Sequence, residues 1–167
     1  MTDPSALLFD FSDPATAQRF RAVDDRVMGG VSRSTLRSAG QTAAFEGELS
    51  TERNGGFASV RSDPDPVDLS ALDGLELRVR GDGRTYKVRM RTDGRFDGVS
   101  YQASFAPPEG EWATIRIPFE SFRPTYRGRT PRGAAPFDPS AVQSFGLLVA
   151  NEQVGRFRLE LGWIGAY

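Results

Sequence analysis

The hydrophobic and polar residues of this chain alternate with a period of two over much of its length. Residues 75–80 alternate apolar with charged side chains, and residues 86–91 do the same after the turn-forming sequence Gly81-Asp82-Gly83-Arg84. A period of two is the pattern of a half-buried strand. We therefore predict a β-hairpin in which Val79 faces Tyr86 on the buried side, because a register slip of one residue would expose the apolar set.

The same alternation predicts a chain built almost entirely of short strands. Further strands are expected at residues 45–50, 57–61, 101–105, 112–119, 145–150 and 157–163. Asp13-Pro14 predicts a short helix that ends near Phe20, and Asp138-Pro139 predicts a single helical turn. Many short strands with glycine-rich and proline-rich connections indicate an antiparallel β-sandwich that forms one domain over residues 1–167.

Composition narrows the chemistry available to the protein. Its 167 residues are enough to bury about 70% of the surface that the unfolded chain exposes, so one core needs no covalent staples. The chain has no Cys and no His, which removes thiolate nucleophiles and the side chain most used for proton transfer near neutral pH. The net charge of −1 gives no overall attraction to nucleic acid, which we do not expect as a partner.

The N-terminal sequence carries no targeting signal that can be recognised from its residues. It is acidic rather than basic, and the apolar run at residues 6–9 is too short for the core of a signal peptide. No apolar stretch approaches the roughly 20 residues that span a bilayer. We therefore expect a cytoplasmic location without membrane insertion, so that contact with a membrane-bound partner would be peripheral.

Two glycine pairs mark loops in which the backbone needs unusual freedom. Each pair stands beside a bulky apolar residue, Met28 in one loop and Phe57 in the other. We predict that the two loops pack near one another with Met28 and Phe57 turned inward, since glycine permits close backbone approach. The residues of interest in these loops are Asp25, Met28, Gly29, Gly30, Ser32, Asn54, Gly55, Gly56 and Phe57.

Neighbouring carboxylates at Asp24 and Asp25 raise the question of a metal site. A Ca²⁺ ion needs six to eight oxygen ligands, whereas adjacent carboxylates before a glycine turn more often accept hydrogen bonds from backbone amides. We favour the amide-capping role and assign no metal and no cofactor to the chain.

Two arginine-rich stretches are candidate binding surfaces. Residues 123–132 hold four arginines and one tyrosine without any acid, so local pairing cannot neutralise them. Such a segment serves protein docking, phosphate or RNA binding, or structural salt bridges. The second candidate is the charged face of the predicted hairpin, extended by Gln102. The candidate partner-binding residues are Tyr126, Arg127, Arg129, Arg78, Arg80, Arg89, Arg91 and Gln102.

Eight motifs, in order along nearly the whole chain, resemble those of the complex I intermediate-associated protein 30 family. They occupy residues 24–32, 45–50, 54–59, 81–86, 101–105, 117–119, 124–129 and 155–161. The family's usual sequence has Asn where Asp24 stands. The resemblance implies a jelly roll of the galactose-binding-like type, akin to carbohydrate-binding modules. It also implies a chaperone-like assembly factor for the proton-pumping NADH:quinone oxidoreductase, with membrane-complex subunits or other assembly factors as partners.

Three classes of function are then open: a binding or assembly module, a carbohydrate-binding module, and a hydrolase with paired carboxylates. The chain offers no evident carboxylate pair across a cleft, so we do not expect an enzyme. A sugar-binding face needs aromatic side chains on which the sugar rings stack. Tyr101 is the sequence neighbour of Gln102, so the two residues are expected on opposite faces of the strand. Trp112 and Trp163 are expected to face the core, because they lie at apolar positions of alternating segments. We therefore favour the non-catalytic binding or assembly module, with carbohydrate binding as the alternative.

Overall fold

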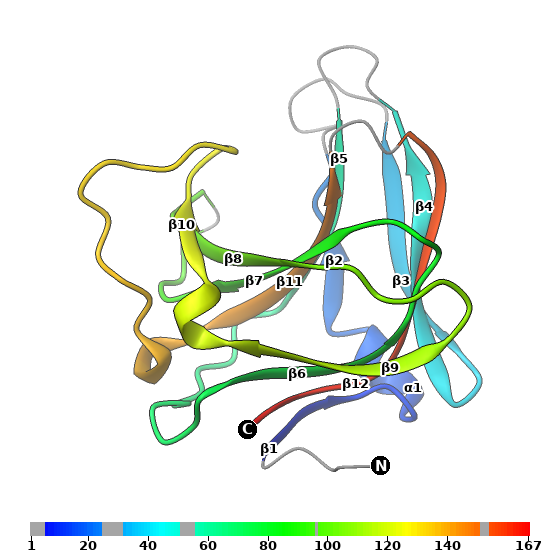
Figure 1. The fold of residues 1–167 in the computed structure, drawn as a ribbon, viewed down its shortest axis with the longest axis horizontal. Helices are drawn as coiled ribbons and strands as arrows, with labels where there is room; N and C mark the ends of the chain where they lie inside the picture. The colour runs from blue at the N-terminus through cyan, green and yellow to red at the C-terminus, as the bar shows by residue number, and fades with distance from the viewer. Residues whose placement is uncertain (1–5, 25–31, 51–55, 96, 151–153) are drawn as a thin grey trace.

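The computed structural model describes residues 6–24, 32–50, 56–95, 97–150 and 154–167, which form two six-stranded sheets packed face to face (Figure 1). Every strand pair is antiparallel, so the predicted antiparallel β-sandwich is confirmed. Sheet A has the order β3-β4-β12-β6-β9, with β1 also beside β12, and sheet B has the order β10-β8-β7-β11-β5-β2.

All strands but β12 have eight residues or fewer, in line with the short strands that the alternation predicted. In sheet A they are β1 (Ala6–Asp10), β3 (Arg33–Ala39), β4 (Thr42–Leu49), β6 (Gly74–Arg80), β9 (Trp112–Pro118) and β12 (Gly155–Ala166). In sheet B they are β2 (Phe20–Ala22), β5 (Phe57–Ser62), β7 (Tyr86–Arg91), β8 (Ser100–Phe105), β10 (Arg123–Thr125) and β11 (Ser144–Ala150). The alternation did not reveal β1, β2, β3 or β10, each of which pairs with a single neighbour.

In the described ranges, helical structure is confined to short turns. Asp13 caps α1 (Pro14–Ala17) by accepting a hydrogen bond from the Ala15 amide at 2.9 Å. Asp138 caps η4 (Pro139–Ala141) in the same way through Ser140. Both helix starts were predicted from their Asp-Pro sequences and are confirmed; a further turn, η3, covers Phe119–Ser121. Among the described residues, no helix has the length and apolar character needed to cross a membrane.

The core lies between the two sheets and is formed by the inward-facing residues of each strand. The apolar residues of 75–79 and 86–90 are fully buried, so the face assigned to them by alternation is confirmed. Phe45, Tyr86 and Phe157 pack together, with 5.0 Å between the ring centroids of Phe45 and Phe157. Burying a large apolar side chain stabilises the fold by about 1.5–3 kcal/mol, so this contiguous core provides the main driving force for folding.

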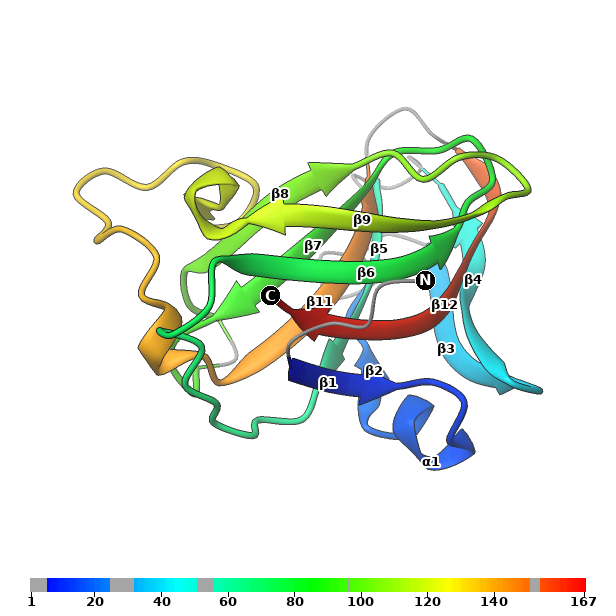
Figure 2. The same cartoon turned by 60° about the horizontal axis from the view of Figure 1, so that its bottom comes forward.

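The predicted hairpin between residues 75–80 and 86–91 is wrong, because these strands belong to different sheets (Figure 2). β6 pairs with β12 and β9, whereas β7 pairs with β8 and β11. Residues 81–85 therefore cross from one sheet to the other instead of forming a hairpin turn. A crossing of this kind keeps both apolar faces in the shared core, so it produces the same alternation as a hairpin.

Asp82 holds this crossing against sheet A. Its carboxylate accepts hydrogen bonds from the Tyr86 hydroxyl at 2.9 Å and from the backbone amides of Arg158 at 2.8 Å and Arg84 at 3.2 Å. The Arg84 guanidinium in turn donates to the carbonyl of Arg156 at 2.7 Å. Burial and the Asp82 carboxylate raise the pKa of Tyr86, so its hydroxyl stays protonated as a donor.

Candidate functional site

The change in strand pairing divides the predicted charged face between opposite sides of the molecule. Arg78 and Arg80 lie on the outer face of sheet A, whereas Arg89, Arg91 and Gln102 lie on the outer face of sheet B. The expectation that these five residues form one binding surface is therefore wrong. Each face has to be judged by its own contacts.

The outer face of sheet A is neutralised by a row of alternating ion pairs. Arg37 and Arg158 each contact Glu46 at 2.5 Å, Arg158 also approaches Glu160 at 3.5 Å, and Glu160 pairs with Arg80. Burial opposes ionisation of Glu46, but hydrogen bonds and attraction from Arg37 and Arg158 outweigh it and lower the pKa of that carboxyl. Because its charges compensate one another, this face has little net attraction for a charged partner.

Two tryptophans were predicted in the core, but both are half-buried on the outer side of sheet A. Trp112 lies opposite Arg80 at the start of β9, and the guanidinium carbons of Arg78 and Arg80 lie 6.0 and 5.8 Å from its ring centroid. Trp163 follows a register shift after Leu161, which moves it out of the buried alternation. These contacts give Arg78 and Arg80 a structural role beside Trp112.

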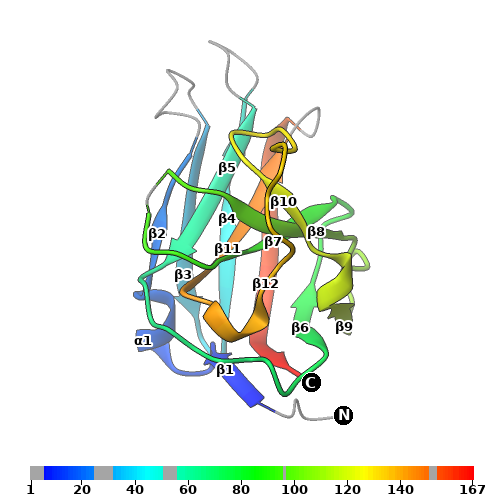
Figure 3. The ribbon, with the colours of Figure 1, turned by 90° about the vertical axis from the view of Figure 1, so that its left-hand side faces the viewer.

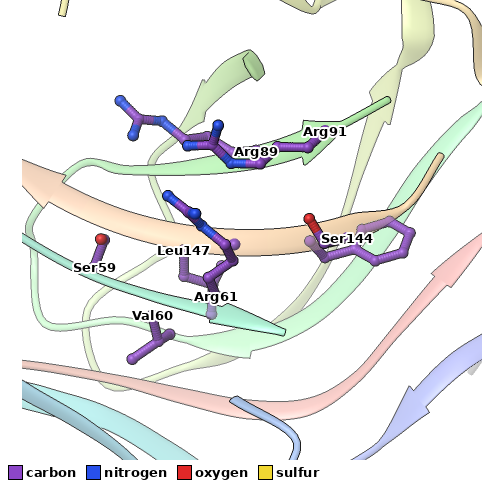
Figure 4. Close-up of a pocket in the computed structure, with 9 residues that line it drawn as sticks. Ser59, Val60, Arg61, Arg89, Arg91, Ser144 and Leu147 are labelled. Carbon is purple, nitrogen blue, oxygen red and sulfur yellow. The ribbon is translucent and has the colours of Figure 1, made fainter. Parts of the chain in front are cut away.

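Three arginines, which we call the arginine cluster, gather on the outer face of sheet B: Arg61, Arg89 and Arg91 (Figure 4). They line a small hollow whose floor is β11. The Nε of Arg89 donates to Oε1 of Gln102 at 2.9 Å, and Nη1 of Arg91 donates to the Gly98 carbonyl at 2.9 Å. The structure thus brings Arg89, Arg91 and Gln102 together as predicted and adds Arg61, which the sequence analysis did not select.

The arginines of this cluster repel one another through a partly dehydrated environment. Burial and the Arg91 guanidinium lower the pKa of Arg61 to about 10. Burial, Arg91 and Arg61 together lower the pKa of Arg89 to about 10, and burial also lowers the pKa of Arg91. Since a value near 10 lies well above neutrality, Arg61 and Arg89 remain cationic at pH 7, and their charges are concentrated on one face.

The loops that contain the glycine pairs are tied together at their described ends. The Ser32 hydroxyl donates to the Ser50 carbonyl at 3.0 Å and accepts from the Ser50 amide at 2.9 Å. Asp24 accepts hydrogen bonds from the Ser34 amide, the Ser34 hydroxyl and the Ser59 amide at 2.9, 2.5 and 2.9 Å. These contacts join β3, β4 and β5 to the end of β2 at one end of the sandwich (Figure 3).

The predicted amide-capping role is confirmed for Asp24, and the remaining loop predictions divide into two groups. Phe57 was expected to face inward, but its neighbour Ala58 occupies the core, so Phe57 shares the outer face with Ser59 and Arg61 and is half-buried. Gly56 has φ +140°, a conformation that side chains rarely adopt. Asp25, Met28, Gly29, Gly30, Asn54 and Gly55 lie outside the described residues.

The segment after β10 forms a tight two-residue turn. Tyr126 and Arg129 exchange backbone hydrogen bonds of 2.7 and 3.0 Å, and the central residues Arg127 and Gly128 have φ values of 49° and 79°. Positive φ at both central positions is typical of a type I′ turn. The turn presents Arg127 and Arg129 at the edge of sheet B, as part of a surface that is largely exposed.

An acid from a distant loop reaches this turn. Arg127 contacts Asp97 at 2.5 Å, and the Tyr126 hydroxyl donates to the same carboxylate at 3.3 Å. The expectation that no acid would neutralise the segment is therefore wrong for Arg127, because Asp97 comes from the β7–β8 connection rather than from the segment itself. The Arg127 hydrogen bond lowers the pKa of Asp97. The role of Tyr126, Arg127 and Arg129 in partner binding stays a prediction.

The described part of the chain contains no group of three or more acidic side chains that could hold a metal ion.

A second hollow is lined mainly by apolar residues of η3, β10 and the segment 134–137, including Phe119, Phe122 and Phe137. The Tyr101 hydroxyl, expected to lie away from the Gln102 face, donates to the Ala135 carbonyl at 2.8 Å and helps to fix this segment.

Comparison with known sequences relates the chain to one family. Residues 9–161 match the sequence model described as Complex I intermediate-associated protein 30. An uncharacterized protein of Schizosaccharomyces pombe is 34% identical over 89% of this chain and 78% of its own length. Proteins named complex I intermediate-associated protein 30, mitochondrial, are 27% identical in Drosophila melanogaster and 25% identical in Mus musculus. The matches cover 95% and 99% of this chain but only 62% and 57% of those relatives.

Solved structures with a similar fold are carbohydrate-binding modules and parts of larger enzymes. A family 11 carbohydrate-binding module from Clostridium thermocellum, in complex with a mixed-linked tetrasaccharide, superposes with a TM-score of 0.71 over 96% of both chains at 19% identity. An agarase superposes with a TM-score of 0.65 over 98% of this chain and 26% of its own, at 14% identity. Likeness at this level of identity establishes the jelly-roll fold and no ligand.

Proposed function

Because the chain belongs to the complex I intermediate-associated protein 30 family, we propose that it is a non-catalytic binding module that assists the assembly of respiratory complex I. The observation that carries the proposal is the family match over residues 9–161, which spans nearly the whole sandwich. The names of the fly and mouse relatives link the family to complex I. Those relatives are also named as mitochondrial, so the cytoplasmic location of this chain stays a prediction.

The contacts of the two outer faces support sheet B as the side that meets the partner. On sheet A, the described arginines largely pair with glutamates, so a partner would have to break existing ion pairs. On sheet B, Arg21 and Arg127 each pair with an aspartate. The described hydrogen bonds of Arg89 and Arg91 go to neutral groups instead, and the Tyr126–Arg129 turn extends the cationic surface at the edge. Arginine and tyrosine are favoured where protein interfaces concentrate their binding energy.

Carbohydrate binding is the second candidate because the fold is shared with sugar-binding modules. Pyranose rings are usually held by stacking on aromatic side chains. Among the described strand residues on the outer face of sheet B, Phe57 is the one aromatic, and its neighbours along the strand are Ser59 and Arg61. The arginine-rich composition of this face therefore favours a charged partner over a neutral polysaccharide.

The proposal is tested by capture of the full chain and its partners from the native cell, followed by mass spectrometry. We expect subunits or assembly proteins of respiratory complex I to be enriched over a mock capture. In parallel, purified protein is passed over immobilised β-glucan and agarose. Retention on a polysaccharide without enrichment of complex I proteins would replace the assembly role with carbohydrate binding.

The turn after β10 allows partner binding to be tested separately from stability. Changing Arg127→Ala together with Arg129→Ala should leave the melting temperature nearly unchanged, because an exposed ion pair such as Arg127–Asp97 contributes at most about 1 kcal/mol. Recovery of complex I proteins in the capture should fall about tenfold or more, since truncating a docking arginine costs about 2 kcal/mol of binding energy.

The matched control removes two cations from sheet A, as Arg78→Ala with Arg156→Ala, and should keep the captured proteins. A lower melting temperature with unchanged partners for the Arg127 and Arg129 pair would instead assign these arginines a structural role.

A further inference from the structure

Sheet A ends at β9 with an edge to which no other strand pairs in the part of the chain that the structure describes (Figure 2). β9 has seven residues, and its pairing with β6 runs along the whole strand without a register shift. Other edges are shorter or covered: β2 and β10 have three residues each, and β3 lies beside α1 and β2. Natural proteins usually blunt a long edge with a bulge, a lysine or a central proline, all of which β9 lacks.

The direction of the backbone groups of β9 follows from the pairing on the far side of β6. Gly74 exchanges hydrogen bonds of 3.0 and 3.2 Å with Tyr167, which follows β12. Because successive residues of a strand direct their backbone groups to opposite edges, Leu75 and every second residue after it bond to β9. These residues pair with the odd-numbered positions of β9, so the even-numbered positions point their amides to the open edge. Those amides belong to Trp112, Thr114 and Arg116.

The core is also incompletely covered along β9. Ala113 and Ile115 face inward but are only half-buried. Val79 and Leu77, with which they pair on β6, are 0% exposed. A further strand beside β9 would remove more of the apolar surface of Ala113 and Ile115 from water. The edge therefore offers an added strand both backbone hydrogen-bonding groups and uncovered apolar side chains.

From this edge we propose that the chain self-associates through β9, which pairs antiparallel with β9 of a second copy about a two-fold axis at Thr114. In that register Thr114 faces its counterpart, and Trp112 faces Arg116 on the outer side of the sheet. On the inner side Ala113 faces Ile115, so apolar surface meets apolar surface. Threonine pairs, and an arginine beside an aromatic ring, are favourable neighbours across strands.

The same register also satisfies the backbone of both copies. Residues at even-numbered positions face one another, so each outward amide meets a carbonyl of the other copy. Arg116 is the one charged residue of β9, and it meets no like charge across the axis. The inference goes beyond the proposed assembly role, because it concerns the association of the purified chain with itself.

Sedimentation velocity of the full chain over a range of concentrations measures the self-association. One added strand forms a small interface, so we expect a reversible dimer whose fraction rises with concentration. Hydrogen exchange followed by NMR locates the interface: exchange at Trp112, Thr114 and Arg116 should slow as concentration rises. Exchange at Ala113 and Ile115, whose amides already bond to β6, should change less. A chain that stays monomeric at the millimolar concentrations used for NMR, or protection confined to other strands, would overturn the proposal.

A charge placed at the two-fold axis separates this pairing from other modes of association. Thr114→Lys and Thr114→Glu each put like charges face to face and should weaken dimerisation about fivefold or more, whereas an equimolar mixture of the two variants should restore it. The matched controls are Thr35→Lys and Thr35→Glu, at an exposed threonine on the opposite edge strand β3, and they should dimerise as the wild type does.

Thermal unfolding followed by circular dichroism shows whether each variant is folded, and the exchange measurement on the wild type requires no variant. A Thr114→Glu variant that dimerises alone as well as the wild type would contradict the register at Thr114, because the glutamate would then face something other than its own copy. A mixture no better than the separate variants would overturn the proposal in the same way.

Discussion

Replacing Asp24 with alanine should lower the free energy of unfolding by about 3 kcal/mol. The residue is 7% exposed, and its carboxylate accepts hydrogen bonds from the Ser34 amide, the Ser34 hydroxyl and the Ser59 amide. A hydrogen bond to a charged group contributes about 1.5–3 kcal/mol, and a buried donor left without an acceptor costs about 1–3 kcal/mol. Since one residue joins the end of β2 to β3 and β5, its loss leaves several buried donors at once.

Urea unfolding followed by circular dichroism measures the effect, and Asp24→Asn is the matched control. The amide keeps one oxygen acceptor and the shape of the side chain, so we expect a loss of about 1–2 kcal/mol, smaller than that of the alanine variant. An alanine variant within 0.5 kcal/mol of the wild type, a difference typical of neutral surface substitutions, would show that Asp24 does not hold these strands together.

Asp24 also shows what the sequence could predict about the candidate loops. A carboxylate before a glycine-rich turn indicated amide capping, and that role is confirmed. The identity of the amides could not be predicted, because Ser34 and Ser59 lie ten and thirty-five positions away. Ser59 is brought near Asp24 by the pairing of β2 with β5, and Ser34 by the packing of sheet A against sheet B. The sequence therefore predicted that Asp24 accepts hydrogen bonds from backbone amides, whereas which amides these are depends on the tertiary fold.

The division of charge between the two faces was not predictable from alternation. A period of two identifies which residues face the core but does not identify the sheet to which a strand belongs. Arg78 and Arg89 therefore shared a predicted face while the structure separates them by the thickness of the sandwich. The sequence did not identify Arg61 as a candidate residue, because its neighbours Gly146 and Arg21 come from remote parts of the chain.

Asp97 illustrates the same limit for charge counting. The stretch 123–132 contains no acid, and the sequence argument treated its arginines as free of local partners. The β7–β8 connection places Asp97 beside the Tyr126–Arg129 turn because β8 pairs with both β7 and β10. Both Arg127 and Arg129 are exposed, but counting charges within the segment missed the acid that pairs with Arg127.

The second large effect is expected at the crossing between the sheets, where Asp82→Ala should destabilise the fold by about 3 kcal/mol. Glu160 is the first residue of β12 that pairs with β6, and Arg158 lies before it in the same strand. There the Arg158 amide donates to the Asp82 carboxylate at 2.8 Å instead of to β6. The Tyr86 hydroxyl donates to the same carboxylate from a ring that is fully buried. Removing the carboxylate leaves both donors without this acceptor and frees the crossing from sheet A.

Tyr86→Phe separates the two contributions, because it removes a single hydrogen bond and keeps the aromatic packing against Phe45 and Phe157. We expect it to cost about 1 kcal/mol, and the double variant with Asp82→Ala to cost less than the sum, since the two residues share that bond. Thermal and urea unfolding of the three variants measure the coupling. Strict additivity, or an Asp82→Ala variant as stable as the wild type, would show that the crossing is held by its backbone contacts and by Arg84 rather than by the Asp82 carboxylate.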